Sequence, residues 1–212
     1  MTDLELAQAA ADCYESGASW EHVWQLDDVW VATRRNGSGE RVIAFRGSRT
    51  VEDWLRDLTA MPTYLKRIGW VHKGFSEGMI DVLNETRSIM ASEPVWISGH
   101  SLGAARAWIY AALVLTARNV VKPAGVATIG TPRPGFPHLR KLVAKSGIHA
   151  RAYANKGDPV CDVPLRIPFI WPYCEPVDPI EIDVAPDDGA DGPLARHHAA
   201  LYVKGVSALS IG

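Results

Sequence analysis

The fold of this chain is decided by one stretch, VWISGHSLG (residues 95–103). Its first four residues form a short apolar run after Pro94, a pattern typical of a buried strand. A helix rich in alanine and leucine is expected to follow, from Leu102 to about Ala117. The stretch therefore predicts a strand that turns sharply into a long helix.

The turn fits the pattern G-x-S-x-G, which holds a serine between a strand and a helix. Gly99 and Gly103 leave room for close approach of the backbone on both sides of Ser101. The helix N-terminus favours negative charge that develops beside the hydroxyl. We predict Ser101 as a nucleophile; the alternative is a glycine-rich turn with an incidental serine.

Outside this stretch, short apolar strands alternate with helical patterns. Two strands within 30–47 are expected to join at a turn over 36–39, and further strands at 124–130 and 149–154. Helices are expected over 76–90, 136–146 and 199–209, near the N-terminus and over 53–58, with a loop-rich segment at 162–193. This alternation predicts an α/β fold, a mostly parallel central sheet with helices on both faces.

A nucleophilic serine needs a histidine base and a carboxylate that orients it. When the serine lies on such a turn, the acid and then the histidine follow it along the chain. Asp158 lies in the loop after the strand that ends near Ala154, with Asp162 as its nearest rival. An ordinary turn aspartate is the alternative. Only His197 and His198 lie farther along the chain, so one of them is the expected base.

Acyl transfer also needs donors for the oxyanion of the tetrahedral intermediate. The backbone N–H of Leu102, directly after the nucleophile, is one candidate. The other is Ser48, in the loop after the apolar strand that begins at Val42. The alternative for Ser48 is a cap at the strand end.

The stretch 50–58 is amphipathic and is expected to form a short helix. Val51, Trp54 and Leu55 fall on its apolar face. One interpretation is a lid that covers the site and meets lipid when it opens; the other is a surface helix packed permanently on the core. Trp171 is likewise expected either to contact an acyl chain or simply to pack.

The motifs, taken together, resemble the class 3 lipase family, the fungal-lipase-like branch of the α/β-hydrolases. The similar segments follow in the family's order over about residues 40–165, with a weaker match at 197–205. They are FRGS (45–48) with DWLRDL (53–58), VHKGF (71–75), GHSLGAA (99–105), GTPRPG (130–135) and NKGDPV (155–160).

The resemblance implies one α/β-hydrolase domain over 1–212 with a short lid around 49–60. It also implies Ser101 as nucleophile, Asp158 as acid, and Ser48 with Leu102 as the oxyanion hole. Many bacterial and plant relatives have a tyrosine five residues after the catalytic histidine. Tyr202 then indicates His197, whereas the closer spacing of fungal members would favour His198. We choose His197.

The composition and net charge of the chain bear on its binding partners, its location and its cysteine chemistry. The chain has 212 residues, 47% of them hydrophobic, and a net charge of −2, so nothing predicts binding to nucleic acid. No transmembrane segment and no signal peptide is recognised, and a cytoplasmic or non-classically exported protein is expected. The three cysteines fit neither a disulfide framework nor a zinc site, although Cys161 and Cys174 could pair in an oxidising compartment.

The expected function is hydrolysis of carboxylic esters through an acyl-enzyme by a lipase or esterase, without metal or organic cofactor. Acylglycerols or related lipid esters, met at a lipid interface, are the first substrate class. An acyltransferase or a phospholipase on the same triad is the alternative among enzymes. The alternative of another class is a catalytically silent binding module. The residues do not predict an oligomeric state.

Overall fold

A computed structural model describes residues 1–48, 50–51, 61–186 and 192–210 of the chain. Its strands are β1 (His22–Leu26), β2 (Val29–Arg35), β3 (Arg41–Phe45), β4 (Pro62–Leu65), β5 (Gly69–His72), β6 (Val95–His100), β7 (Gly125–Ile129), β8 (His149–Asn155) and β9 (Ile180–Ile182). Its α-helices are α1 (Asp3–Asp12), α3 (Lys73–Ser76), α4 (Met79–Ser92), α5 (Leu102–Thr116), α6 (Pro137–Ser146) and α7 (Ala199–Leu209). Two short 3₁₀ helices are η1 (Pro159–Asp162) and η2 (Ala195–His197).

Seven strands form the main sheet, in the order β1-β2-β3-β6-β7-β8-β9. From β3 to β9 neighbouring strands run parallel, and β1 and β2 add an antiparallel edge. The expectation of a mostly parallel sheet is confirmed. Because the central strands are parallel, their carboxyl ends meet at one edge of the sheet, and the loops that follow them gather there.

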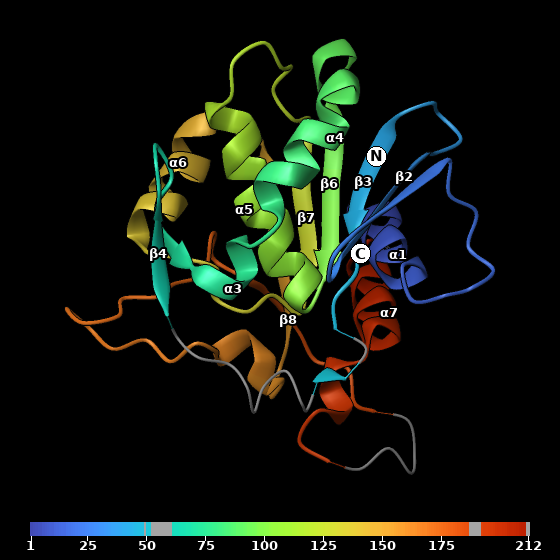
Figure 1. The fold of residues 1–212 in the computed structure, drawn as a ribbon. Helices are drawn as coiled ribbons and strands as arrows, with labels where there is room; N and C mark the ends of the chain where they lie inside the picture. The colour runs from blue at the N-terminus through green and yellow to red at the C-terminus, as the bar shows by residue number, and fades with distance from the viewer. Residues whose placement is uncertain (49, 52–60, 187–191, 211–212) are drawn as a thin grey trace.

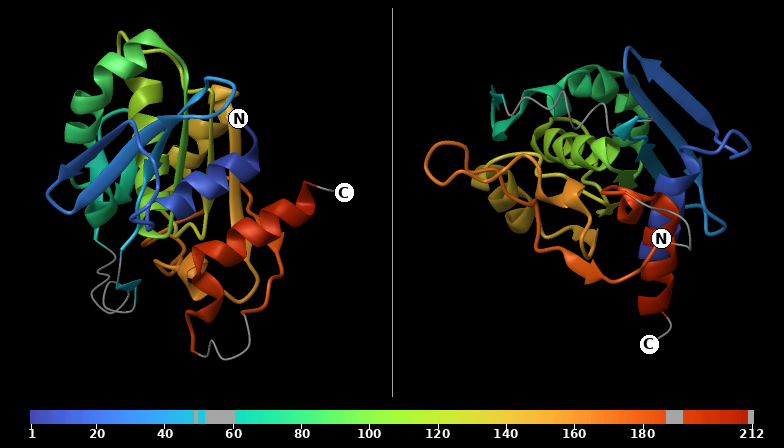
Figure 2. Two further views of the ribbon diagram at one scale, coloured as in Figure 1. Left: turned by 90° about the vertical axis from the view of Figure 1, so that its right-hand side faces the viewer. Right: turned by 90° about the horizontal axis from the view of Figure 1, so that it is seen from below.

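Helices cover both faces of the sheet (Figure 1). Helices α3, α4, α5 and α6 lie on one face, and α1 and α7 lie together on the other. The view from below in Figure 2 shows the two layers on either side of the strands. On the α5 side the core is built around large buried side chains such as Phe45, Phe75 and Trp108. Helix α5 is buried along almost its whole length, which fixes the residue before it, Ser101, against the sheet.

Local sequence explains several element boundaries. Helix α1 begins with a capping box, in which Thr2 and Glu5 satisfy each other's backbone N–H groups. Helix α6 begins with a proline at its first position, where a missing N–H costs nothing. Gly147 ends it in the left-handed conformation (φ 67°). These signals are all local, so the sequence alone predicts these helices within a few residues.

The structure differs from these expectations in several short strands and at the start of one helix. The strand β1, the hairpin β4–β5 and the short strand β9 were not predicted. The residues of β1 and β4 are exposed or half-buried, β5 is only four residues long, and β9 has three residues among prolines and aspartates. The helix expected over 76–90 is confirmed as α4, but it begins only at Met79, because Gly78 before it takes φ 75°, and the separate short helix α3 precedes it. The helix expected over 53–58 lies outside the described residues.

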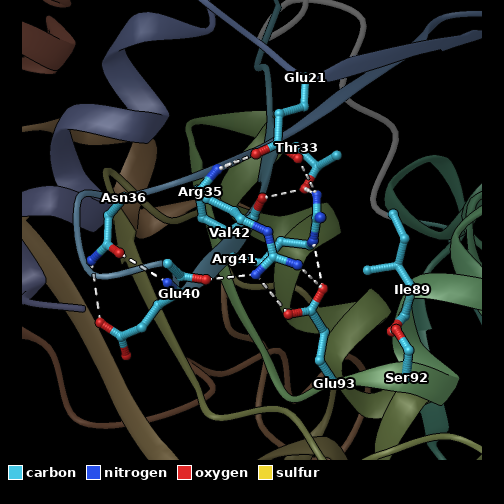
Figure 3. Close-up of polar contacts among 11 residues, drawn as sticks. Glu21, Thr33, Arg35, Asn36, Glu40, Arg41, Val42, Ile89, Ser92 and Glu93 are labelled. Atoms are coloured by element: carbon cyan, nitrogen blue, oxygen red, sulfur yellow. Dashed lines mark hydrogen bonds and ion pairs between the residues drawn. The ribbon is translucent and has the colours of Figure 1, made fainter.

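The antiparallel edge is tied to the helical layer by a group of charges (Figure 3). Glu93, just after α4, accepts hydrogen bonds from Arg35 of β2 (2.6 and 2.9 Å) and from Arg41 of β3 (2.9 Å). Arg41 also donates to Glu21 (2.7 Å). Arginine donors hold the pKa of Glu93 below its usual range. The group therefore connects β2 and β3 to the carboxyl end of α4.

Candidate active site

Ser101 lies between the last residue of β6 and the first residue of α5, as predicted. Its φ of 59° is uncommon for a residue other than glycine and marks local backbone strain. The Ser101 N–H donates to the carbonyl of Ile129 in β7 (3.3 Å), and the Ser101 carbonyl accepts from Ala104 (2.9 Å). The side chain is fully buried, and its Oγ has no hydrogen-bond partner among the described residues. The hydroxyl is thus held in place by the backbone alone.

Close packing at the turn explains its glycines. A Cβ on Gly99 would lie 2.5 Å from the carbonyl oxygen of Gly103, and one on Gly103 would overlap the backbone of Phe45. A Cβ on Gly47 would lie 2.6 Å from the carbonyl oxygen of His100. No side chain fits at these approaches. The end of β3 is therefore pressed against the turn that carries Ser101.

Asp158 and His197 form a buried hydrogen-bonded pair. The two atoms Nδ1 of His197 and Oδ2 of Asp158 are 2.6 Å apart. Because a carboxylate only accepts, Nδ1 carries the hydrogen, and Nε2 is left with its lone pair in the neutral ring. That Nε2 is buried and has no partner among the described residues. The ring is oriented as a general base requires.

Three donors surround the carboxylate of Asp158. Besides His197, the Tyr202 hydroxyl donates to Oδ2 (2.5 Å) and the Val160 N–H donates to Oδ1 (2.9 Å). Burial alone would raise the pKa of Asp158, but these hydrogen bonds outweigh it and leave the pKa below its ordinary value. The carboxylate is therefore charged and fixed beside the imidazole.

The structure separates the two histidines that the sequence left as alternatives. His197 is buried and faces Asp158, whereas His198 is exposed at the start of α7. A Cβ on Gly130, directly after β7, would lie 2.9 Å from Cε1 of His197. The imidazole thus lies against the end of β7, the strand whose last carbonyl receives the Ser101 N–H. Ser101, Asp158 and His197 are brought to the same edge of the sheet.

A second buried histidine, His100, connects the site to its surroundings. Its Nε2 lies 2.8 Å from the carbonyl oxygen of His197, so Nε2 carries the hydrogen and donates. Its Nδ1 then accepts from the Tyr14 hydroxyl (2.8 Å), whose oxygen in turn accepts from the Gly47 N–H (3.1 Å). Burial, and then the neighbouring His197, lower the pKa of His100 to about 3, so it is neutral. One continuous chain of hydrogen bonds joins the end of β3 to the backbone of His197.

Neither His100 nor Tyr14 was predicted as a site residue. Tyr14 follows α1, and no local motif distinguishes it from a surface tyrosine. Tyr202 was used only for its spacing from His197; its contact with Asp158 was not predicted. Its spacing is the one signal in the sequence that pointed toward this contact.

A cavity of about 560 Å³ lies beside the pair. Ser48, Val51, His100 and His197 all line it, together with residues of α1 and α7. Ser101 does not line it, so substrate can reach the hydroxyl only if residues that cover it move. The cavity places Ser48 and Val51 on the same side of the site as the imidazole.

Of the other predicted site residues, some lie near Ser101, one lies away from the cavity, and two lie outside the described residues. The Ser48 hydroxyl accepts from the Thr50 N–H (3.3 Å) and lies 3.2 Å from its carbonyl oxygen, a local turn at the end of the β3 loop. Leu102 is the first residue of α5, where a helix leaves its N–H without an intrahelical partner. The oxyanion role of both residues stays a prediction. Trp54 and Leu55 lie outside the described residues, and Trp171 lies in a loop away from the cavity.

The part of the chain that the structure describes has no feature that indicates metal chemistry, a disulfide or a membrane span. Within it, no three His, Cys, Asp or Glu side chains lie close enough to bind a metal ion. Cys161 and Cys174 are free thiols, and Cys161 lies 3.6 Å from the Tyr202 hydroxyl. None of the described helices is both long and apolar enough to cross a bilayer.

A family model described as lipase (class 3) matches residues 42–167. A lipase of Rhizomucor miehei is 30% identical over 141 residues, 60% of this chain and 39% of that protein. A chloroplastic phospholipase A(1) of Arabidopsis thaliana is 32% identical over 155 residues, 61% of this chain and 35% of that protein. The chain thus spans less than half the length of these curated relatives.

The fold comparison covers more of the molecule. The structure of the Rhizomucor miehei triacylglyceride lipase superimposes with a TM-score of 0.69 at 24% identity, over 86% of this chain and 77% of that one. The superimposed part of this chain is therefore longer than the segment that the family model matches. From its family match, which includes both Ser101 and Asp158, and from its fold, the chain belongs to the class 3 lipase family.

Proposed function

We propose that this chain hydrolyses carboxylic esters through an acyl-enzyme formed on Ser101. The observation that carries the proposal is the buried Asp158–His197 pair, which lies at the same sheet edge as a strained serine with an unpartnered hydroxyl. Strain and unsatisfied buried polar atoms cost stability, and they are retained mainly where function needs them. The proposal gives both free atoms, Ser101 Oγ and His197 Nε2, a role.

The proposed reaction follows from which atoms are free. Nε2 of His197 accepts the proton of Ser101 as Oγ attacks the ester carbonyl. The Asp158 carboxylate stabilises the imidazolium that forms, and the backbone N–H groups of Ser48 and Leu102 bind the oxyanion. His197 then returns the proton to the departing alcohol. A water molecule, deprotonated by the same imidazole, releases the acid and restores Ser101.

Lipid esters, with acylglycerols first, are the proposed substrate class. Support comes from the names of the relatives, a lipase and a phospholipase A(1), and from the family. Hydrolysis of a phospholipid by the same residues is the second candidate, favoured by the 32% identity to the phospholipase. A panel of emulsified mono- and diacylglycerols and phosphatidylcholine, assayed side by side, separates the two by relative kcat/KM.

Replacement of the nucleophile tests the proposal directly. Ser101→Ala should lower kcat for p-nitrophenyl butyrate by about 10⁴-fold or more, with the circular dichroism spectrum unchanged. The matched control is Ser92→Ala, at the exposed end of α4, which should keep full activity.

A fluorophosphonate probe should label the wild type and Ser92→Ala but not Ser101→Ala. Wild-type protein that neither labels nor hydrolyses any ester would favour the silent binding module. Rising ester product with added alcohol, at the expense of free acid, would favour acyl transfer.

A further inference from the structure

Exposed apolar side chains gather in one short loop. Five residues of 165–171, here called the apolar loop, are large, hydrophobic and exposed: Leu165, Ile167, Phe169, Ile170 and Trp171. Phe169 at the tip is fully exposed, and Leu165 and Ile170 expose 70% and 67% of their surface. A contiguous apolar patch of this kind, unlike scattered single residues, marks a surface that another phase or partner covers.

Hydrogen bonds hold the apolar loop in its projecting shape. At its neck, the N–H of Ile167 donates to the carbonyl of Trp171 and the N–H of Trp171 donates back, both at 2.9 Å. At its base, the Arg133 guanidinium donates to the carboxylates of Asp162 (2.8 Å) and Glu175 (2.7 Å), one on each side of the loop. The apolar side chains therefore project from a hairpin that is closed by backbone hydrogen bonds, and Arg133 connects the two ends of the segment.

The apolar loop belongs to the edge of the sheet that carries the site. It begins three residues after η1, whose N-cap is Asp158. Figure 1 shows it in orange at the level of the sheet's carboxyl edge, and Figure 2 shows it projecting beyond the body of the molecule. The apolar loop therefore projects sideways from the same end of the sheet as the loops that surround Ser101.

The charge of the segment fits a phospholipid surface. Between Val163 and Cys174 the only charged side chain is that of Arg166, and there is no acid. Aromatic and aliphatic side chains enter the boundary between headgroups and acyl chains, and a neighbouring cation pairs with lipid phosphate. A convex tip enters a fluid interface readily, whereas a protein partner would need a groove that matches it.

We propose that the apolar loop is a lipid-docking surface, which inserts Phe169 and Ile170 into a phospholipid layer and holds the site edge against it. The docked lipid would be the source of substrate, so this part of the inference rests on the proposed function. Insertion itself needs no catalysis, and it is therefore tested separately.

The test is vesicle flotation of the full chain with diether phosphatidylcholine, which has no carboxylic ester to hydrolyse. The double variant F169S/I170S should lower the partition coefficient by more than about tenfold, because two large apolar side chains lose their burial. The matched control is Ile80→Ser, on α4, where Ile80 is 55% exposed but isolated from the apolar loop. It should stay within about twofold of the wild type.

Two further measurements decide between explanations. Hydrolysis of p-nitrophenyl acetate by F169S/I170S should match the wild type, since neither residue lines the cavity beside the site. Wild-type protein that does not float, or a double variant that floats equally well, overturns the proposal. So does a wild-type dimer in sedimentation that the double variant turns into a monomer, because a second copy would then cover the loop. Loop-dependent flotation without any ester hydrolysis would leave the docking surface standing and reject the proposed function.

Discussion

At the scale of single residues, the candidate site depends on two histidines in different electrostatic settings. His197 faces the charged carboxylate of Asp158 at 2.6 Å. His100 is equally buried but hydrogen bonds only to neutral groups, the Tyr14 hydroxyl and the His197 carbonyl. With no carboxylate in contact, desolvation dominates and keeps the His100 ring neutral. The neutral ring of His100 therefore places no positive charge beside His197. The His197 imidazole must itself become positively charged during the proposed reaction.

This setting predicts how stability depends on pH. The pKa of His100 is about 3 in the folded protein and near 6.5 when unfolded, so below pH 6.5 the unfolded chain binds a proton that the folded chain cannot. Stability therefore falls as pH drops from 6.5 toward 3, by up to roughly 1.4 kcal/mol per pH unit from this residue.

Urea unfolding across this pH range measures the slope. His100→Gln keeps a donor and an acceptor without a titrating ring, and its slope should be shallower than that of the wild type. The control for replacement of a histidine is His22→Gln, at the exposed start of β1. Equal slopes for all three proteins would mean that His100 does not titrate as described.

At the scale of elements, the site is built by the contact between the end of β3 and the start of α5. The turn at Ser101 is possible only because Gly103 lets the helix approach the backbone of Phe45. Helix α5 is in turn fixed by its nearly complete burial in the core. The position of the nucleophile is thus a consequence of packing between elements, not of the turn sequence alone.

The close contact between β3 and α5 predicts that replacement of Gly103 lowers stability. Gly103→Ala should lower the free energy of unfolding by about 1–3 kcal/mol, because the new Cβ overlaps backbone that cannot rotate away. Gly37→Ala, in the turn between β2 and β3, is the matched control: nothing lies within 4 Å of its added Cβ. Chemical denaturation of both variants gives the comparison. Similar stabilities would show that β3 and α5 are packed less tightly than described.

At the scale of the whole molecule, the antiparallel edge must stay attached to the parallel sheet for β3 to keep its place beside Ser101. The hydrogen bonds from Arg35 of β2 and Arg41 of β3 to Glu93 connect these two strands to the end of α4. Glu93 keeps a quarter of its side-chain surface exposed, so solvent weakens each ion pair, yet two arginines share the one carboxylate.

The ion pairs at Glu93 predict a moderate loss of stability that depends on salt when Glu93 is replaced. Glu93→Ala should lower the free energy of unfolding by about 1 kcal/mol, and high salt should narrow the gap to wild type. Glu85→Ala, on the exposed face of α4, controls for removal of an acid and gain of alanine. Thermal unfolding at low and high salt measures both. A loss in Glu85→Ala equal to that in Glu93→Ala would contradict the role of the charge group.

Local sequence signals were enough to predict the strands and helices with strong periodicity, the turn that carries Ser101, and the order of Ser101, Asp158 and a histidine along the chain. These features are local: an apolar run, a glycine pair or a spacing specifies them without knowledge of the rest of the chain. For the same reason the resemblance to one family was visible in short motifs.

The packing of the folded chain, in contrast, is what makes His197 face Asp158 and His198 face solvent. It also brought Tyr14 to His100 across 86 positions of sequence, and left Phe169 exposed where composition alone suggests burial. His197 and His198 are neighbours and have the same local sequence signals. One is buried and the other exposed because the folded chain directs only the side chain of His197 toward the core. Contacts between distant residues depend on the packing of whole elements, and no local pattern encodes them.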